Sequence, residues 1–360
     1  MKAAILYEQK KPLVVEEIEI EDPKQGEVMV KMAAAGVCRS DLSFIEGLWP
    51  ALLPMVMGHE GAGVVEKIGP GVTLVQPGDH VILSFVPSCG TCRNCTRGKP
   101  YLCAAGPSSV MRDGTTRFKK GEQQLFHQTA VSAFSEHIVT HETAMVKIRD
   151  DMPLDKAALI GCGVMTGMGA VINTAKVEPG SCVAVFGCGG VGLNVIQGAA
   201  LSGAAKIIAV DTLDRKLDMA KGFGATHLVN GSKEDAGAKI REISGGTGAD
   251  YSFEVVGLPE LVTQAFDATD PSGQAIMVGM PPLGSPITIN STALFVGKTL
   301  KGALYGSSRF RTDMPALVDL YMGGKVKLDE LITRSYPLEK INDAFDAMKK
   351  GEVARSIIKF

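Results

Sequence analysis

The sequence lacks a marked excess of charge of either sign. Its 360 residues include 37 lysines and arginines and 39 aspartates and glutamates, which leaves a formal net charge of −2. A chain with this balance has no dominant basic surface for a nucleic acid or for an anionic membrane. We therefore expect neither as a partner.

No secretory signal is expected at the N-terminus. The apolar run within residues 1–8 is too short, before charge resumes, to form the core of a signal peptide. We therefore expect a cytoplasmic protein. Because thiols stay reduced in that compartment, the eight cysteines are expected to be metal ligands or free thiols before disulfides.

A membrane-spanning segment is not expected. Residues 181–205 carry no charged side chain and are long enough to cross a bilayer. Their middle holds glycines that would break a spanning helix: Gly187, Gly189, Gly190 and Gly192. We therefore expect shorter elements in this stretch.

Internal repeats and low-complexity segments are absent, and the length suggests two or so domains of about 150 residues each. Up to about Arg149, short apolar or alternating runs are separated by glycine, proline and aspartate. The clearest of these runs are Val14–Ile20, Val28–Met32, Ala62–Ile68 and Val81–Val86. Closely spaced runs of this kind predict a small antiparallel barrel or sandwich.

The middle of the chain reads as a strand, a glycine turn, a helix, a second strand and an acid. Ser181–Phe186 is an apolar run typical of a buried strand, and a G-x-G-x-x-G motif begins directly after it at Gly187. Leu193–Leu201 has helical character, and Lys206–Val210 is a second apolar run that ends in Asp211. The motif alone is weak, but this context is the one that a dinucleotide-binding fingerprint requires.

Each residue of the motif has a separate physical role. Gly187 permits a tight turn, Gly189 lets a pyrophosphate approach the backbone, and Gly192 lets the helix pack closely on the sheet. The helix N-terminus attracts the phosphates. Asp211 would accept hydrogen bonds from the adenosine ribose and repel a 2′-phosphate, so NAD is favoured over NADP. The alternative is a glycine-rich turn without a ligand.

Strands and helices continue to alternate after Asp211, which predicts a doubly wound parallel sheet. Helices are expected at Leu213–Lys221 and Leu261–Ala268, and strands at His227–Val229, Tyr251–Val256, Ala275–Gly279 and Leu300–Tyr305. The C-terminal part is expected to add helices at Pro315–Met322 and Leu338–Lys350 and a last strand at Ser356–Phe360.

Three possible ligands of a catalytic metal lie far apart in the sequence. Cys38 and His59 lie on separate turns of the N-terminal region, and Cys162 follows much later. Two thiolates and an imidazole leave the fourth position of a tetrahedral zinc open, as a catalytic site requires. The alternative is that these three residues are unrelated, and the spacing alone does not decide.

A second group of cysteines has the spacing of a closed metal site. Its members follow the pattern C-x₂-C-x₂-C-x₇-C and are Cys89, Cys92, Cys95 and Cys103. Four thiolates predict a structural zinc. An iron–sulfur cluster is less favoured, because the bacterial ferredoxin run has a shorter last gap and a proline after it. The two remaining cysteines, Cys182 and Cys188, are interpreted as small buried residues.

In their order, these motifs resemble those of the zinc-dependent medium-chain alcohol dehydrogenases, and the resemblance covers essentially the whole chain. It is closest to the class III-like and acceptor-dependent branch. It implies an α/β protein with a GroES-like β-barrel catalytic domain over residues 1–163, which includes the cysteine lobe at 89–103. A Rossmann NAD-binding domain would follow over 164–305, and residues 306–360 would return to the catalytic domain.

The resemblance also implies roles for single residues. Cys38, His59 and Cys162 would hold a catalytic zinc, with Glu60 beside it and Asp41 fixing the His59 tautomer. Ser40 would take the proton of the alcohol. The residues expected to contact NAD, besides the glycines of the turn, are Arg39, Thr166, Val191, Asp211, Lys216 and Arg355. Taken singly, Arg39 or Arg355 would be an ordinary solvated arginine.

The implied reaction is hydride transfer from a primary aryl or medium-chain alcohol on zinc to NAD, which gives the aldehyde, and its reverse. The cofactors are two Zn²⁺ per chain, one catalytic and one structural, and NAD. Phe85, Trp49 and Leu304 would line the alcohol pocket and favour larger alcohols over ethanol; otherwise they are core residues. A homodimer or homotetramer is expected, with sheets joined near Thr299–Tyr305.

Two positions depart from better-known members of the family. Many members carry a proton-relay histidine where this chain has Ser43, which cannot act as a base near neutral pH. The segment before Asp113 lacks the arginine that glutathione-dependent formaldehyde dehydrogenases use, and Arg112 is out of place for that role. We therefore predict a glutathione-independent enzyme.

Three other functions remain open from the sequence. They are a glutathione-dependent formaldehyde dehydrogenase, an acceptor-dependent dehydrogenase with tightly bound nicotinamide, and an inactive scaffold that binds zinc and nucleotide.

Overall fold

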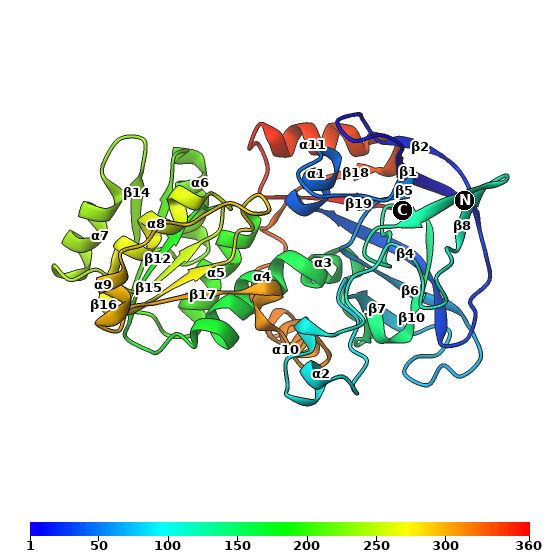
Figure 1. Ribbon diagram of the computed structural model, residues 1–360, viewed down its shortest axis with the longest axis horizontal. Coiled ribbons are helices and arrows are strands. Elements are labelled where there is room, and N and C mark those ends of the chain that lie inside the picture. The colour runs from blue at the N-terminus through cyan, green and yellow to red at the C-terminus, as the bar shows by residue number, and fades with distance from the viewer. The chain divides into compact units, whose positions relative to one another are not determined.

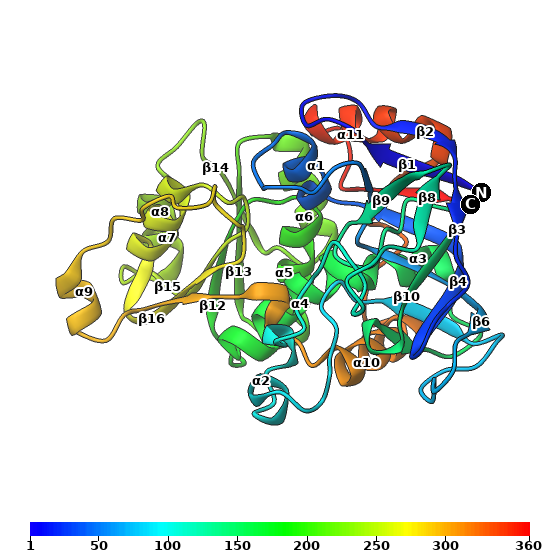
Figure 2. The same ribbon diagram turned by 45° about the vertical axis from the view of Figure 1, so that its right-hand side comes forward.

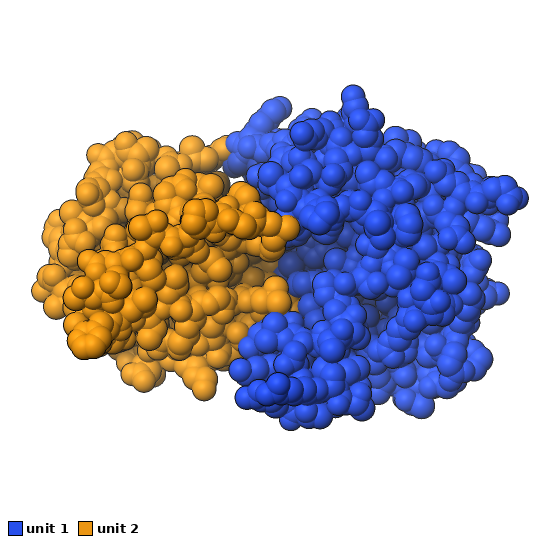
Figure 3. All heavy atoms as spheres, viewed as in Figure 1, with its two compact units in different colours: residues 1–162, 309–360 blue, residues 163–308 orange.

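The computed structural model describes all 360 residues (Figure 1). The chain forms two compact units (Figure 3). Unit 1 comprises residues 1–162 and 309–360, and unit 2 comprises residues 163–308.

The larger sheet of unit 1 is built around the long strand β4. Its path is β11-β7-β6-β4-β19-β18, and β10 also pairs with β4. The strands are β4 (Glu27–Val37), β6 (Gly61–Ile68), β7 (His80–Leu83), β10 (His137–His141), β11 (Met145–Lys147), β18 (Ile332–Pro337) and β19 (Arg355–Lys359). All pairs except β18 with β19 are antiparallel, which agrees with the predicted antiparallel character of this region.

The second sheet of unit 1 has the order β2-β1-β5-β9-β8-β3. Its strands are β1 (Lys2–Leu6), β2 (Val14–Glu17), β3 (Glu19–Ile20), β5 (Met55–Val56), β8 (Phe118–Lys120) and β9 (Gln123–His127). Figure 2 shows β8 and β9 side by side, as their antiparallel register requires. The expected run Val14–Ile20 forms β2 and β3. The other four strands, which are two to five residues long, were not among the expected strands.

The C-terminal residues complete unit 1. The last strand, β19, pairs antiparallel with β4; in Figure 1 β19 is red and β4 is blue. The helices of this unit are α1 (Arg39–Ile45), α2 (Arg93–Thr96), η1 (Pro100–Leu102), η2 (Glu142–Ala144), α3 (Leu154–Leu159), α10 (Phe310–Met322), η6 (Leu338–Lys340) and α11 (Ile341–Lys349). The core includes Val30 of β4, Val65 of β6, Ile138 of β10 and Phe345 of α11.

The predicted start of α10 was wrong by five residues. The helix was expected at Pro315–Met322, but it begins at Phe310. The backbone N–H of Arg309, just before the helix, donates to Asp313 Oδ2 at 2.8 Å. This hydrogen bond stabilises a helix start that lies more than one turn before Pro315.

Unit 2 is a six-stranded parallel sheet in the order β14-β13-β12-β15-β16-β17. Its strands are β12 (Cys182–Phe186), β13 (Lys206–Asp211), β14 (His227–Asn230), β15 (Ala249–Glu254), β16 (Thr269–Met277) and β17 (Thr299–Gly302). The intervening helices are α5 (Gly190–Leu201), α6 (Asp214–Gly222), α7 (Ala236–Ser244), α8 (Pro259–Asp267) and α9 (Ser291–Phe295). The chain winds outward from β12 to β14 and then back past β12, so right-handed crossovers place α5 and α6 opposite α7 and α8.

The last expected strand of this sheet is shorter than predicted. It ends at Gly302, and η5 (Leu304–Ser307) follows as a short turn in place of strand. Tyr305 and Gly306 have φ values of 52° and 62°. Left-handed backbone of this kind cannot continue a strand.

One helical stretch, Leu154–Ala175, is long and apolar enough to span a membrane, but 78% of its apolar window is buried inside the protein. It comprises α3, the π-helical turn η3 (Ile160–Val164), α4 (Met165–Gly169) and the π-helical η4 (Ala170–Ala175). Such burial is typical of a core helix. Residues 181–205 form a strand, a turn and a helix, as expected.

Candidate functional site

Cys38 lies at the point where β4 ends and α1 begins. Its backbone N–H donates to Asp41 Oδ2 at 3.1 Å, so Asp41 caps the start of α1. An acid in the first turn also suits the helix dipole. This local arrangement fixes a thiol and a carboxylate on one buried turn.

His59 follows a glycine that no other residue can replace without strain. Gly58 has φ +98°, and a Cβ there would lie 2.4 Å from Phe134 N. His59 Nδ1 lies 2.6 Å from Asp41 Oδ1, and both side chains are buried. Because the carboxylate accepts a hydrogen bond from Nδ1–H, the lone pair of Nε2 is left free for a metal. Asp41 is therefore in hydrogen-bond contact with the ring whose tautomer it is predicted to fix.

Cys162 lies in the π-helical turn η3. Such turns are rare and frequently mark functional sites. The preceding Gly161 allows this turn to approach β7, since a Cβ there would lie 2.9 Å from Leu83 O. As a result, Cys162 Sγ lies 3.3 Å from His59 Nε2.

These side chains form one buried group of possible metal ligands. One ligand atom from each of Cys38, His59, Glu60 and Cys162 lies within 4.8 Å of the other three. Glu60 Oε1 is buried without a hydrogen-bond partner, whereas Glu60 Oε2 accepts a hydrogen bond from Arg355 Nη2. An unpaired buried oxygen is costly unless a cation or another group satisfies it. Two thiols, one imidazole and one carboxylate fit zinc by donor type and by spacing.

The electrostatics of the group also favour a cation. The pKa of the Cys38 thiol is lowered well below its usual value, chiefly because Cys162 donates a hydrogen bond to it and His59 lies close. The pKa of Cys162 is raised well above its usual value by the same pairing and by burial. Burial raises the pKa of Glu60 to about 7, although Arg355 opposes that shift. A bound divalent cation would favour the deprotonated form of each group.

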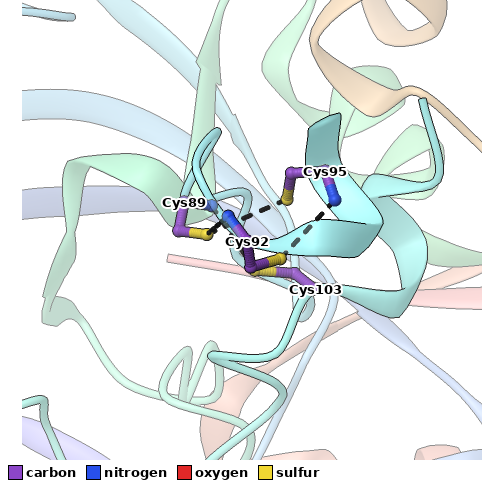
Figure 4. A group of neighbouring side chains, drawn as sticks. All are labelled: Cys89, Cys92, Cys95 and Cys103. Carbon is purple, nitrogen blue, oxygen red and sulfur yellow. Dashed lines mark hydrogen bonds between the residues drawn. The ribbon is translucent and has the colours of Figure 1, made fainter. Parts of the chain in front are cut away.

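The second cysteine group forms a compact cluster (Figure 4). The four sulfur atoms of Cys89, Cys92, Cys95 and Cys103 lie within 4.8 Å of one another. Backbone N–H groups point at these sulfurs: Cys92 N lies 3.3 Å from Cys89 Sγ, and Cys95 N lies 3.5 Å from Cys92 Sγ. Donors aimed at sulfur stabilise thiolates, and four thiolates form a closed tetrahedral zinc site.

The pKa values of this cluster are shifted in opposite directions. The backbone N–H of Cys92 lowers the pKa of Cys89 to about 6. Burial raises the pKa of Cys95 to about 11, with neighbouring thiols adding to the shift.

The two cysteines outside both metal groups, Cys182 and Cys188, are buried. Burial raises the pKa of Cys182 to about 11 and that of Cys188 to about 12. Both therefore remain protonated at neutral pH, as suits buried packing residues.

The glycine turn of unit 2 has the features that a dinucleotide requires. Gly187 has φ +101°, which favours glycine, and a Cβ on Gly192 would lie 1.8 Å from Gly187 O. A Cβ on Gly189 would meet nothing within 4 Å, so open space lies beside the backbone just before α5. The turn therefore fits a pyrophosphate at the helix N-terminus.

Asp211 lies at the end of β13 and turns back toward this glycine turn. Its Oδ2 accepts a hydrogen bond from Cys188 N at 2.9 Å, and Lys216 Nζ lies 3.7 Å from the same oxygen. Thr166 lies on α4 and Val191 on α5. These two helices pack closely, since a Cβ on Gly167 of α4 would lie 2.6 Å from Val191 O. These residues all belong to unit 2.

The other predicted residues have mixed surroundings. Arg39 is exposed and lies 3.4 Å from Glu46, whereas Arg355 is buried against Glu60 instead of being solvated. Ser40 is half-buried in the first turn of α1. Ser43 is buried, and its Oγ–H donates to Arg39 O at 3.2 Å.

The residues predicted to line the pocket also differ from one another. The Phe85 ring meets the His59 ring edge to face, with centroids 5.5 Å apart. The Trp49 ring packs in the same way on Phe44, at 5.3 Å. Leu304 belongs to unit 2 and is 52% exposed. Arg112 donates to Thr143 Oγ1 at 2.9 Å.

Sequence reasoning missed two features of the metal group. Gln128 contacts Asp41 but belongs to no motif, and its position in a loop gave no signal. The π-helical turn that carries Cys162 was also not predicted. The only indication in the sequence was the run Gly161-Cys162-Gly163, since glycines on either side of a cysteine indicate that another segment approaches the backbone closely.

The fold and these two groups define a zinc-binding and dinucleotide-binding oxidoreductase. Comparison with known families identifies it further. The family described as "Alcohol dehydrogenase GroES-like domain" matches residues 24–150, and the family described as "Zinc-binding dehydrogenase" matches residues 190–322.

Individual relatives agree over the full length of the chain. It is 44% identical to the S-(hydroxymethyl)glutathione dehydrogenase of Paracoccus denitrificans, covering 99% of each protein. It is 43% identical to the class-3 alcohol dehydrogenase of Dictyostelium discoideum, covering 99% of this chain and 97% of the relative. The crystal structure of benzyl alcohol dehydrogenase from Acinetobacter calcoaceticus superposes with a TM-score of 0.95 at 36% identity, covering 100% of this chain and 99% of that one.

The chain therefore belongs to the zinc-dependent medium-chain alcohol dehydrogenase family, near its class III members. It is an NAD-dependent zinc oxidoreductase with a GroES-like domain and a Rossmann domain. Its substrates are small alcohols or aldehydes.

Proposed function

We propose that this enzyme interconverts primary aryl or medium-chain alcohols and their aldehydes, with NAD as the hydride acceptor. The observation that carries the proposal is the buried group of Cys38, His59 and Cys162, with the unpaired Glu60 Oε1 beside it. A zinc ion held there would act as a Lewis acid that lowers the pKa of an alcohol hydroxyl. Unit 1 would then be the catalytic domain and unit 2 the NAD-binding domain.

Protein groups would orient the reactants and move the proton. Asp41 holds the His59 ring in one tautomer. We assign Ser40 Oγ to accept the proton of the alcohol. Ser43 does not extend that route, because its hydroxyl already donates to Arg39 O. Water or the ribose hydroxyls would therefore carry the proton onward.

The coenzyme would bind at the glycine turn of unit 2. Asp211 and Lys216 would contact the adenosine ribose, and Thr166 and Val191 would lie behind the nicotinamide. Arg39 and Arg355 would face the pyrophosphate. For Arg355 this role must coexist with its buried contact to Glu60.

The preference for larger alcohols rests on Phe85. Its ring packs against the imidazole of His59, and an aromatic wall at this distance favours an aryl or extended apolar group. The similarity to a benzyl alcohol dehydrogenase supports the same class of substrate. Trp49 and Leu304 are proposed as further parts of the pocket.

A second candidate is the oxidation of S-(hydroxymethyl)glutathione, because a relative with that name is 44% identical. Against it, Arg112 is engaged with Thr143.

NADH formation should be measured with benzyl alcohol, hexanol, ethanol and hydroxymethylglutathione, and again with an artificial electron acceptor. Much faster oxidation of hydroxymethylglutathione would overturn our proposal. Turnover only with the artificial acceptor would indicate tightly bound nicotinamide, and no turnover with two bound zincs would indicate a scaffold.

We also propose a cytoplasmic homodimer or homotetramer. Strand β17 lies at the edge of its sheet and leaves backbone groups available for pairing. Several large apolar side chains are exposed in the segments just before it: Met280, Leu283, Phe295 and Val296. A second copy joined along β17 would cover them, and the mass in solution tests this.

A further inference from the structure

Gln128 occupies a fully buried position next to the metal group. It begins the loop between β9 and β10, and its side chain reaches two other segments. Its Nε2 donates to Asp41 Oδ1 at 2.9 Å, and its Oε1 accepts a hydrogen bond from Gly58 N. The amide therefore joins the residue that orients His59 to the backbone that precedes His59.

The orientation of this amide follows from its partners. A backbone N–H can only donate, so the atom facing Gly58 must be the amide oxygen. The NH₂ group then faces Asp41, whose carboxylate accepts. Both ends of Gln128 are satisfied in one orientation only, and glutamine is long enough to join both partners.

Asp41 is held by three N–H donors. Its Oδ1 receives His59 Nδ1 and Gln128 Nε2, and its Oδ2 receives Cys38 N. Each donor approaches from a different segment, so the carboxylate cannot rotate without losing at least one hydrogen bond. Because the carboxylate is fixed, the plane of the His59 ring and the direction of Nε2 are fixed as well.

The loop that carries Gln128 has an unfavourable backbone. Thr129, Ala130 and Ser132 all have positive φ, at 54°, 58° and 56°. Non-glycine residues rarely adopt this conformation, and it persists where surrounding contacts hold it. Here the backbone N–H of Gln128 lies 3.1 Å from both Val56 O and Ser132 Oγ. The bond to the Val56 carbonyl needs no side chain of the loop, and it holds the Gln128 backbone against β5.

We propose that Gln128 is a positioning residue of the catalytic metal centre. It acts through Asp41 on His59 and does not touch the metal or the substrate. This inference rests on the proposed role of Cys38, His59 and Cys162 as zinc ligands.

The test is the rate at which purified holoenzyme releases zinc to a chromogenic chelator, with the melting temperature measured in parallel. Gln128→Met removes both hydrogen bonds at similar length. Gln128→Leu also removes both hydrogen bonds, and it is the second variant if Gln128→Met fails to fold. Ser132→Ala is the matched control, because it removes a hydrogen bond of the same loop and leaves the amide unchanged. Cys162→Ala identifies which zinc is the catalytic one.

We expect both Gln128 variants to release the catalytic zinc about 10- to 100-fold faster than the wild type, the usual effect of losing a partner behind a metal ligand. Ser132→Ala should release it at the wild-type rate. In the cobalt-substituted enzyme, the thiolate-to-cobalt absorption should shift in the Gln128 variants only. Wild-type zinc release in both Gln128 variants, or equal acceleration in Ser132→Ala, would overturn the proposal. If Cys162→Ala instead retains both zincs, the ligand assignment itself fails.

Discussion

Arg355 and Glu60 form a buried ion pair between residues 295 positions apart in the sequence. Arg355 begins β19, and Glu60 directly precedes β6; these two strands lie on either side of β4. Glu60 also follows His59 in the chain. The pair therefore links the C-terminal strand to the metal group, and both side chains are almost entirely inaccessible to solvent.

Removing one partner should leave a buried charge without compensation. We expect Arg355→Met to destabilise the folded protein by about 3–5 kcal/mol, because Glu60 would remain buried and unpaired. The double variant Arg355→Met with Glu60→Gln should recover a large part of that loss. Thermal and denaturant unfolding of the two single variants and the double variant would measure the coupling. Additive losses in the double variant would contradict a specific pairing.

The sequence predicted the parallel sheet better than the antiparallel ones. Strands β12 and β13 are continuous apolar runs, since a parallel sheet is covered on both faces. In unit 1, strands such as β5 (Met55–Val56) contain two residues and show no periodicity. The pairing of β19 with β4 depends on contacts between distant parts of the chain, which no local pattern reports.

For the site, the sequence pointed to the motif residues and to Asp41, but not to Gln128 or to the contact between Arg355 and Glu60. Cys38, His59 and Cys162 occur in short glycine-containing motifs, and the structure brings them together. Gln128 has no such context, because its importance arises only where its loop meets Asp41 and Gly58. The contact between Arg355 and Glu60 was also invisible, since it joins two separate motifs.

Asp211 should set the preference between NAD and NADP. Asp211→Asn keeps an oxygen for Cys188 N but removes the negative charge. We expect kcat/KM for NAD to fall by about tenfold, since a charged hydrogen bond contributes about 1.5–3 kcal/mol, and activity with NADP to increase. Steady-state kinetics with both coenzymes would measure this. Asp214→Asn, at an exposed acid that pairs with Lys233, is the control and should leave the coenzyme ratio unchanged. Equal effects of the two substitutions would refute the role of Asp211.

The cysteine lobe should hold its metal independently of the catalytic group. Cys92→Ala removes one of four clustered sulfurs, so we expect zinc content to fall from about two to about one per chain. The remaining zinc should still require Cys162. Elemental analysis of the purified protein is the measurement, and Cys182→Ala, at a buried cysteine outside both groups, should retain both zincs. Loss of both metals in Cys92→Ala would show that the two groups are not independent.

His127 should make the protein sensitive to acid. It is fully buried, its Nε2 accepts a hydrogen bond from Arg117 N at 3.1 Å, and its ring lies 4.6 Å from that of Phe118. Burial lowers its pKa to about 3, and the nearby Arg117 guanidinium adds to the shift. In the unfolded chain a histidine has a pKa of about 6.5.

The sign of the effect follows from these two values. Above about pH 6.5 the imidazole is neutral in both states, and the stability that depends on it is fully present. As the pH falls from there toward 3, only the unfolded state binds the proton, so stability decreases by up to about 1.4 kcal/mol per pH unit.

His127→Gln keeps an acceptor for Arg117 N but does not titrate. Its melting temperature should therefore fall less steeply between about pH 6 and 4 than that of the wild type. Parallel slopes for His127→Gln and the wild type would contradict a neutral buried imidazole at this position.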